Sequence, residues 1–518
     1  MPDPPNLILF FADNLGFADV SCFGAAASRT PNIDRLASEG LRLKNWNSGA
    51  SLCSPSRAAL LTGRLEVRTG VFPRVFKQAA HGLPDSETTL AQSLREVGYY
   101  NGAIGKWHLG QRSQYLPTRR GFDEYLGVPY SMDMGSLDGG RHCADDVNST
   151  AWLPLLHNET VAEQPVDVER LASRYAAFAR SFLRRSAARR FFLYVAFSHV
   201  HQLCAPGRGQ WVGPAFANTS ARPFDDAVAE MDWLTGEVMR EQTALGLDDS
   251  TLTLWTSDDG PWTAEQQQAG STGPFQARWF IDNAPAGCFA CPGGYVHAPT
   301  PARPARCACG AAEVDGIRCE YDVGLGSTWE ANLRMPAIAR WPGHIAAGAA
   351  SLALVSTLDV LPTALALAHA EVPAGRVLDG IDISSVLFGG AEPANRTLFF
   401  WRDGGSADAS TWLGATPPNA PQLFAVKLGR HKIHLQTKSA TGDDAAVVHS
   451  PPLLFDVLAD AAEAYPIDDA PLVELMVAQA KAHMQSIVWA SALTLETDPR
   501  FAICANASNA CRTTGVAR

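Results

Sequence analysis

Four apolar runs alternate with helical patterns along the first half of the chain. A continuous apolar run at Asn6–Ala12 is typical of a strand buried on both faces, Arg190–Phe197 predicts another buried strand, and Tyr99–Ile104 and Thr251–Thr256 also predict strands. Capped or helix-favouring stretches at 30–40, 89–97, 166–185 and 227–245 predict helices near or between them. This alternation predicts an α/β fold in which helices cover both faces of a large mixed, mostly parallel sheet.

Polar residues follow each of these apolar runs. They are Asp13/Asn14, Lys106/His108, His199/His201 and Asp258/Asp259. Asp and Asn also make ordinary turns after strands, so each pair taken alone has a structural explanation. The carboxyl ends of parallel strands lie along one edge of a sheet, however, and ligands bind at that edge. Four pairs of complementary chemistry therefore favour one shared site.

The rest of the chain predicts a second, smaller unit. Short apolar stretches at 397–401, 424–428, 431–435 and 453–458 predict antiparallel strands, and 472–488 predicts a closing helix. We therefore divide the chain into a catalytic part, 1–394, and a C-terminal α+β part, 395–518. We expect residues 275–320 to form an insertion that is rich in Ala, Pro, Gly and Arg and carries five cysteines. Its cysteines lack the second CxxC or the histidines of a zinc site, which favours a disulfide-stapled surface loop, or untranslated sequence retained in the gene model, over a metal site.

Composition narrows the function classes. The 518 residues are 46% hydrophobic, and the net charge is −11 without a run of Lys or Arg. This balance argues against nucleic-acid binding, and an acidic protein that handles anions must concentrate positive charge in a pocket. No apolar run is long enough to span a bilayer, since the run at 352–368 is broken by Asp359 and Pro362.

Cysteines and glycosylation sequons indicate an oxidising compartment. The chain has 11 cysteines, with Cys504 and Cys511 as a candidate bridge in the tail, and sequons at Asn148, Asn158, Asn218, Asn395 and Asn506. Both features favour a disulfide-bonded glycoprotein that is secreted or lysosomal. Met1 is followed almost at once by a predicted strand, so we expect the signal peptide to be absent from this sequence.

The segment 52–64 predicts a helix with a cysteine at its start. Pro55 suits a first helical position, and Gly63 suits the end. Cys53 would then lie beside free backbone N–H groups and the positive end of the helix dipole, and Arg57 adds a cation about one turn later. A lone buried cysteine before an ordinary helix is the simpler alternative.

The run C-S-P-S-R-A-A-L-L-T-G-R at 53–64 resembles the sulfatase signature over its whole length. The resemblance implies an alkaline-phosphatase-like fold and a Cys53 that a formylglycine-generating enzyme converts to formylglycine. The hydrated aldehyde is then the nucleophile, and Arg57 stabilises it. If Cys53 is converted, an even ten cysteines remain for disulfides.

Further residues carry the resemblance. G-K-W-H-L-G at 105–110 resembles the second sulfatase signature and implies that Lys106 contacts sulfate and that His108 assists the hydrate. His201 resembles the histidine that faces the leaving oxygen, and His199 is a weaker substrate-binding candidate. Ser131, in V-P-Y-S-M-D, resembles a site serine of the arylsulfatase A group.

The acidic strand ends predict a metal site. Asp13, Asn14, Asp258 and Asp259 offer only oxygen donors, which suits Ca²⁺ or Mg²⁺, and the modified Cys53 would join them. Sulfatases typically carry Asp-Asp after the first strand and Asp-Asn after the later one. This chain has the reverse order, so three carboxylates and one amide are kept in exchanged places.

One position departs from the family pattern G-K-x-x-x-[WYF]-E-G-G-x-R-x-P. Leu325 stands where the sulfate-binding lysine is expected, in G-L-G-S-T-W-E-A-N-L-R-M-P at 324–336, and Arg318 is the nearest candidate substitute. We interpret the chain as a calcium-dependent sulfuric ester hydrolase of aryl, carbohydrate or sulfolipid sulfates. Two alternatives stay open: a phosphoric or phosphonic ester hydrolase of the same superfamily, and a catalytically weakened sulfatase-like binding protein. The partners implied are a sulfated small molecule or glycan and the formylglycine-generating enzyme, and the oligomeric state stays open.

Overall fold

The structure is a computed structural model of the 518-residue chain. It describes all residues except 1, 26–28, 138–151, 204–209, 284–312, 315–316, 319–322, 404, 406–412, 414–415, 418–419, 441–444, 491–496, 498–500 and 504–518. The predicted bridge between Cys504 and Cys511 and most of the predicted insertion therefore lie outside the described residues.

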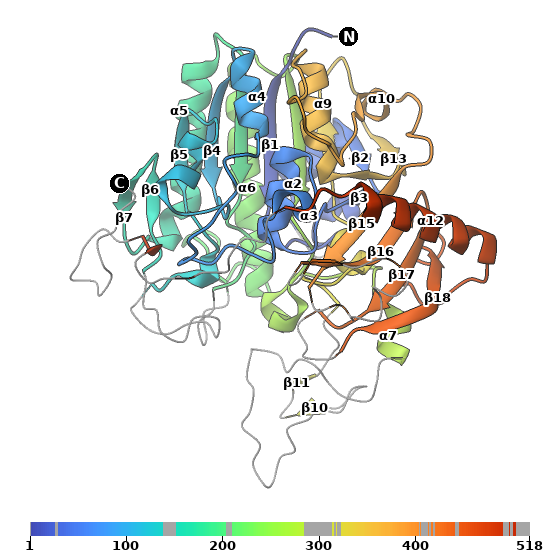
Figure 1. Cartoon of the computed structure of the whole chain (residues 1–518). Helices are drawn as coiled ribbons and strands as arrows, with labels where there is room; N and C mark the ends of the chain where they lie inside the picture. Colours follow the sequence, from blue (N-terminus) through green and yellow to red (C-terminus); the bar gives the residue numbers. More distant parts are fainter. Residues whose placement is uncertain are drawn as a thin grey trace.

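A ten-stranded sheet forms the centre of the molecule (Figure 1). Its order is β13-β2-β12-β9-β1-β8-β4-β5-β6-β7. The central strands β9 (Thr251–Ser257), β1 (Asn6–Ala12), β8 (Phe191–Ala196), β4 (Tyr100–Gly105) and β5 (Glu124–Gly127) are all parallel. Toward the edges of this sheet the pairing becomes antiparallel at β12 (Ile338–Arg340), β6 (Leu155–His157) and β7 (Thr160–Glu163). Beyond β12, the strand β2 (Leu41–Leu43) pairs in parallel with β13 (Ala349–Ser351). The predicted mixed, mostly parallel sheet is confirmed.

Helices cover both faces of this sheet because successive residues of β1 point to opposite sides. Leu7, Leu9 and Phe11 pack with α2 (Cys53–Thr62), α4 (Leu90–Glu96) and α9 (Val360–Leu367). Ile8 and Phe10 pack with α1 (Pro31–Ser38), α5 (Leu171–Ser186) and α6 (Pro223–Ala244). Both faces of β1 are buried, which is why its sequence is apolar from Leu7 to Ala12.

A separate four-stranded antiparallel sheet follows, as the sequence predicts. It contains β15 (Thr397–Arg402), β16 (Gln422–Leu428), β17 (His431–Thr437) and β18 (Val447–Asp456), and α12 (Ala470–Ser486) packs on it (Figure 1). This sheet packs against the main body, since its apolar cluster also contains Ala59, Leu65 and Leu358. The exact division at residue 394 stays a prediction.

Three local features differ from the predicted pattern. Residues 124–127, which are not among the predicted strands, form the parallel strand β5, where Gly127 approaches Gly105 too closely for a side chain. Helix α5 begins at Leu171, later than its pattern predicts, because a short 3₁₀ turn precedes it. Residues 275–283, at the start of the predicted insertion, pack into the body through Phe275 and Phe280, and they include α7 (Arg278–Asn283).

The described cysteines and sequons are few. Cys22 and Cys53 both have free thiols, and the other nine cysteines lie outside the described residues, so the predicted disulfides stay a prediction. Among the sequons, Asn218 and Asn395 are exposed and Asn158 is half-buried, while Asn148 and Asn506 lie outside the described part. None of the helices in the described segments is long and apolar enough to cross a membrane.

Candidate active site

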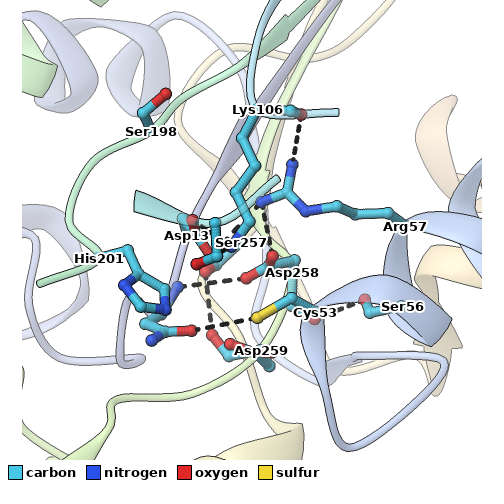
Figure 2. Close-up of polar contacts among 12 residues, drawn as sticks. Asp13, Cys53, Ser56, Arg57, Lys106, Ser198, His201, Ser257, Asp258 and Asp259 are labelled. Atoms are coloured by element: carbon cyan, nitrogen blue, oxygen red, sulfur yellow. Dashed lines mark hydrogen bonds and ion pairs between the residues drawn. The ribbon is translucent and has the colours of Figure 1, made fainter. Parts of the chain in front are cut away.

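The acidic strand ends meet as predicted. β1 and β9 are neighbours in register from Asn6/Thr251 to Ala12/Ser257, so Asp13 and Asp258 leave the sheet side by side. The backbone N–H of Asn14 donates to Asp258 Oδ1 at 3.2 Å. Asp13, Asn14, Asp258 and Asp259 are all buried. Figure 2 shows three of these groups, Asp13, Asp258 and Asp259, beside residue 53.

Cys53 is the first residue of α2, directly after the N-cap Leu52. Its Sγ lies 3.7 Å from Asn14 Oδ1. Ser48 and Ser56 each donate a hydroxyl hydrogen bond to the backbone oxygen of Asp258, at 2.5 and 2.6 Å, which ties the start of α2 to the end of β9. Burial, and next the charge of Asp259, raise the pKa of the Cys53 thiol well above its usual value. The unmodified thiol is therefore protonated, and a protonated thiol is a poor nucleophile.

Two buried cations lie between these carboxylates. Arg57 Nη2 pairs with Asp258 Oδ2 at 2.6 Å, and its Nη1 donates to the backbone oxygen of Lys106 at 3.0 Å. Lys106 Nζ donates to both oxygens of Asp13, at 2.7 and 2.9 Å, and to Ser131 Oγ at 3.1 Å. Arg57, Lys106, Asp13 and Asp258 have side chains that are 0% exposed, so these pairs are screened little by water.

The carboxylates are not equally compensated. Burial would raise the pKa of Asp13, but Lys106 and Arg57 outweigh it and hold that pKa below its usual value. Burial and the charge of Asp13 raise the pKa of Asp258. Burial, followed by the charge of Asp258, raises the pKa of Asp259 well above its usual value, and neither carboxylate oxygen of Asp259 has a hydrogen-bond partner. A buried carboxylate without a partner is costly unless a cation binds it.

The donor set fits a divalent cation. One ligand atom each from Asp13, Cys53 and Asp258 lies within 4.8 Å of the others, and these are the acidic and thiol groups that converge in the described part of the chain. Asp259 lies outside this set of three, but its free oxygens face no other partner. The acidic ligands supply oxygen donors, which Ca²⁺ and Mg²⁺ prefer.

The histidines are placed in different ways. His108 is buried, has φ +59° and has no hydrogen bond at either ring nitrogen, and burial followed by Lys106 lowers its pKa well below the usual value, so its ring is neutral. His201 has Nδ1 at 2.9 Å from the backbone oxygen of Gln202 and Nε2 at 3.8 Å from Asp133 Oδ1. Because a carbonyl only accepts, Nδ1 of His201 bears the hydrogen.

His199 is placed apart from these groups. Its Nε2 lies 2.9 Å from Glu230 Oε2 on α6, and its ring packs against Trp211 at a centroid distance of 4.1 Å. This arrangement supports the end of β8 more directly than it supports contact with a substrate. Ser131, in contrast, joins the site through Lys106.

Leu325 lies at the same edge of the site. It is buried, and its backbone N–H donates to the oxygen of Pro261, two residues beyond Asp259, at 2.9 Å. The side chain of Arg318, the candidate substitute, lies outside the described part.

Two residues near the site were not predicted. Asp133 faces His201, and Asn332 bonds the segments around the site; the only signal in the sequence was that Asn332 replaces a glycine of the family pattern.

Comparisons with known proteins agree with this geometry. A family model described as Sulfatase matches residues 5–370, and one described as C-terminal region of aryl-sulfatase matches 394–513. Human arylsulfatase G is 36% identical over 493 residues, which cover 90% of this chain and 83% of that protein. Human arylsulfatase A is 36% identical over 491 residues, covering 89% and 83%. The crystal structure of the PsFucS1 sulfatase from Pseudoalteromonas sp. superposes with a TM-score of 0.69 at 24% identity, over 93% of this chain and 89% of that one. The predicted alkaline-phosphatase-like fold is confirmed.

Proposed function

The chain belongs to the sulfatase family of sulfuric ester hydrolases, and from this premise we propose that it hydrolyses sulfate esters with a formylglycine made from Cys53 and a bound Ca²⁺. The substrates we propose are aryl, carbohydrate or sulfolipid sulfates. The observation that carries the proposal is the convergence of residue 53, at the tip of α2, with Asp13 and Asp258 within 4.8 Å.

Conversion of Cys53 explains how a nucleophile can arise at this buried position. The thiol itself is held protonated by burial and by Asp259. Formylglycine, once formed by its generating enzyme, supplies a hydrated aldehyde whose hydroxyl groups are nucleophilic at sulfur. Asn14 Oδ1, 3.7 Å from Sγ, and the N-terminus of α2 lie next to residue 53 and would orient those hydroxyl groups.

A divalent cation would balance the charge of the centre. When ionised, Asp13, Asp258 and Asp259 bring three negative charges, and Arg57 and Lys106 bring two positive ones. The excess is one negative charge, which would repel a sulfate ester. A bound divalent ion changes the excess to one positive charge and supplies a Lewis acid for a sulfate oxygen. We propose Asp13, Asn14, Asp258, Asp259 and the modified residue 53 as its ligands, with Ca²⁺ favoured and Mg²⁺ as the alternative ion.

Other side chains would bind the two ends of the ester. Lys106, with Ser131, would contact the sulfate group beside Asp13. The neutral ring of His108 can both donate and accept a hydrogen bond, as handling of the hydrate requires. Nδ1 of His201 is occupied by Gln202, so Nε2 is the ring nitrogen that can face the leaving oxygen.

Leu325 favours a second candidate function, a weakened enzyme that mainly binds sulfated ligands. Leucine can neither pair with an anion nor donate a proton. Loss of one preorganised contact of this kind typically lowers the rate by ~10²–10³. Buried Leu325 donates its backbone N–H to Pro261, so the deficit would fall near the segment that follows Asp259.

Two measurements test the proposed function. Peptide mass spectrometry across residue 53, on protein made in a host that contains the generating enzyme, should show the aldehyde in place of the thiol. Turnover of p-nitrophenyl sulfate should exceed turnover of p-nitrophenyl phosphate and should be lost in Cys53→Ala. An unconverted thiol refutes the nucleophile, preference for phosphate supports the phosphoric ester alternative, and tight sulfate-ester binding with very slow turnover supports the weakened enzyme.

We also propose a secreted or lysosomal location. The exposed sequons Asn218 and Asn395 support it, because glycans are attached to such sites in the secretory pathway. Expression in a mammalian host, followed by removal of N-glycans, should then increase the mobility of the protein on a gel.

A further inference from the structure

Asn332 connects three segments of the active centre through one buried side chain. It lies in the short helix α8 (Glu330–Leu333) and is 0% exposed. Its Nδ2 donates to the backbone oxygens of Ser51, at 3.0 Å, and Ser327, at 2.7 Å. Its Oδ1 accepts from the backbone N–H of Gly260 at 3.0 Å. Because carbonyls only accept and N–H groups only donate, the orientation of the amide is fixed.

The three partners belong to the parts of the site that must be held in register. Ser51 lies two residues before Cys53, and Gly260 directly follows Asp259. Ser327 lies two residues after Leu325, and the neighbouring Gly326 also donates to the oxygen of Ser51, at 2.9 Å. Asn332 therefore joins the segment that leads into Cys53 to the segment after β9 that bears Asp258 and Asp259.

The packing at Gly260 makes this connection tight. A Cβ at Gly260 would lie 2.6 Å from the oxygen of Ala331 and 2.6 Å from Cα of Asn332, so no side chain fits between β9 and α8. Helix α8 is itself anchored, because the Glu330 N–H donates to Glu463 Oε2 at 2.8 Å. A movement of the amide would thus be transmitted to both Ser51 and Gly260.

The family pattern has glycine at the position of Asn332, and glycine has no side chain to make these bonds. We propose that Asn332 is a positioning residue that sets the separation of residue 53 from the Asp258–Asp259 carboxylates. This inference rests on the proposed function, since it assigns Asn332 a role in that reaction.

The test compares Asn332→Ala with a matched control, Asn101→Ala. Asn101 is also 0% exposed, and its Nδ2 donates to two backbone oxygens, those of Ala91 at 2.7 Å and Gly121 at 2.9 Å, near the amino end of β4. Both variants lose two buried hydrogen bonds from Nδ2 to backbone oxygens, and Asn332→Ala also loses the bond from Gly260 to Oδ1. Asn332→Ala should lower kcat for p-nitrophenyl sulfate by about 10²-fold with KM within about threefold, because a displacement near 1 Å at a reacting group can cost this much. Asn101→Ala should leave kcat per folded molecule within about threefold.

A kcat for Asn332→Ala that matches the Asn101→Ala value would overturn the proposal. If Asn332→Ala does not fold, Asn332→Gly, which restores the glycine of the family pattern, is measured by the same criteria. If the wild-type protein shows no sulfate ester turnover, the proposed function fails. The positioning role of Asn332 is then judged by Ca²⁺ titration alone. A loss of Ca²⁺ affinity of about tenfold or more in the Asn332 variant, with none in Asn101→Ala, supports it, and equal affinities in the two variants refute it.

Discussion

The most demanding prediction concerns Glu330, the residue through which α8 is held by the C-terminal sheet. Its Oε2 pairs with Lys427 of β16 at 2.6 Å, and its Oε1 pairs with Lys432 of β17 at 3.1 Å. All three side chains are 0% exposed. Lys427 also donates to Asn47 Oδ1 of the main body at 3.0 Å. Glu330→Gln keeps the shape of the side chain but removes the ion-pair partner of Lys427, while Lys432 still pairs with Glu463 Oε1 at 3.3 Å.

The magnitude follows from this burial. Removing one partner of a buried ion pair typically costs about 3–5 kcal/mol, because the other charge remains unpaired. The cost should depend on pH through Lys427, whose pKa burial lowers to about 7 even with Glu330 present. Without Glu330 this pKa falls further, so Lys427 is neutral in the folded variant. At pH 8 the wild-type Lys427 is already mostly neutral. At pH 5, which is about two units below this pKa, it is protonated. At about 1.4 kcal/mol per unit, Glu330→Gln should therefore be about 2–3 kcal/mol more destabilising at pH 5 than at pH 8.

Thermal unfolding of both proteins at pH 5 and pH 8 measures this difference. The control is Glu159→Gln, which breaks the exposed Arg119–Glu159 pair and should shift the melting temperature by no more than about 1 °C. Glu330→Gln combined with Lys427→Met should recover part of the loss at pH 5, because methionine is buried without having to release a proton on folding. Equal melting temperatures for Glu330→Gln and Glu159→Gln, or a loss that does not grow at pH 5, would refute the reasoning.

Three further predictions follow from single groups. Burial raises the pKa of Glu66 from 4.5 to about 8, so its contribution to folding stability is lost as the pH rises from about 4.5 to 8. Glu66→Gln should therefore make the melting temperature vary less with pH over that range, with the largest gain in melting temperature at pH 8. Leu325→Lys should raise kcat for p-nitrophenyl sulfate by about tenfold or more, and unchanged turnover would show that the leucine causes no deficit. Asp259→Asn should weaken Ca²⁺ binding by about tenfold in calorimetry because it removes one carboxylate, while the double variant with Asn14→Asp, which restores the usual order of the family, should recover most of the affinity; a double variant that binds no better than Asp259→Asn would contradict a compensated exchange.

The central strands and the edge that bears the site could be predicted because their pattern is simple. β1 and β8 are buried on both faces, so their sequences are almost wholly apolar and end where polar residues begin, whereas β9 alternates buried Thr with Leu and Trp. The parallel pairing of β1 with β9 then brings Asp13 next to Asp258 without further information. β5 could not be predicted in this way, because its four residues gain their strand geometry from the close approach of Gly127 to Gly105.

Contacts between distant loops limited what could be predicted of the site. His199 and His201 are two residues apart, yet one bonds Glu230 of α6 and the other approaches Asp133, and nothing in their spacing specifies these partners. Asn332 bonds backbone atoms of Ser51 and Gly260, and backbone partners leave no side-chain pattern to read.

Three departures of this chain from the family pattern affect the segment that follows β9. The carboxylate moved to Asp259 has no ion pair or hydrogen bond in the described residues, whereas Asp13 has Lys106 and Asp258 has Arg57. The next residue, Gly260, is held by Asn332, and Pro261 accepts from the backbone of Leu325. Three changes therefore affect the short segment beyond β9. They are the carboxylate gained at Asp259, the amide gained at Asn332 and the cation lost at Leu325. Since an added negative charge and a lost positive charge both favour binding of a cation, we expect this segment to depend on the proposed metal ion more than the usual arrangement would. The added amide at 332 then supplies, through hydrogen bonds alone, the rigidity that such a site needs without adding charge.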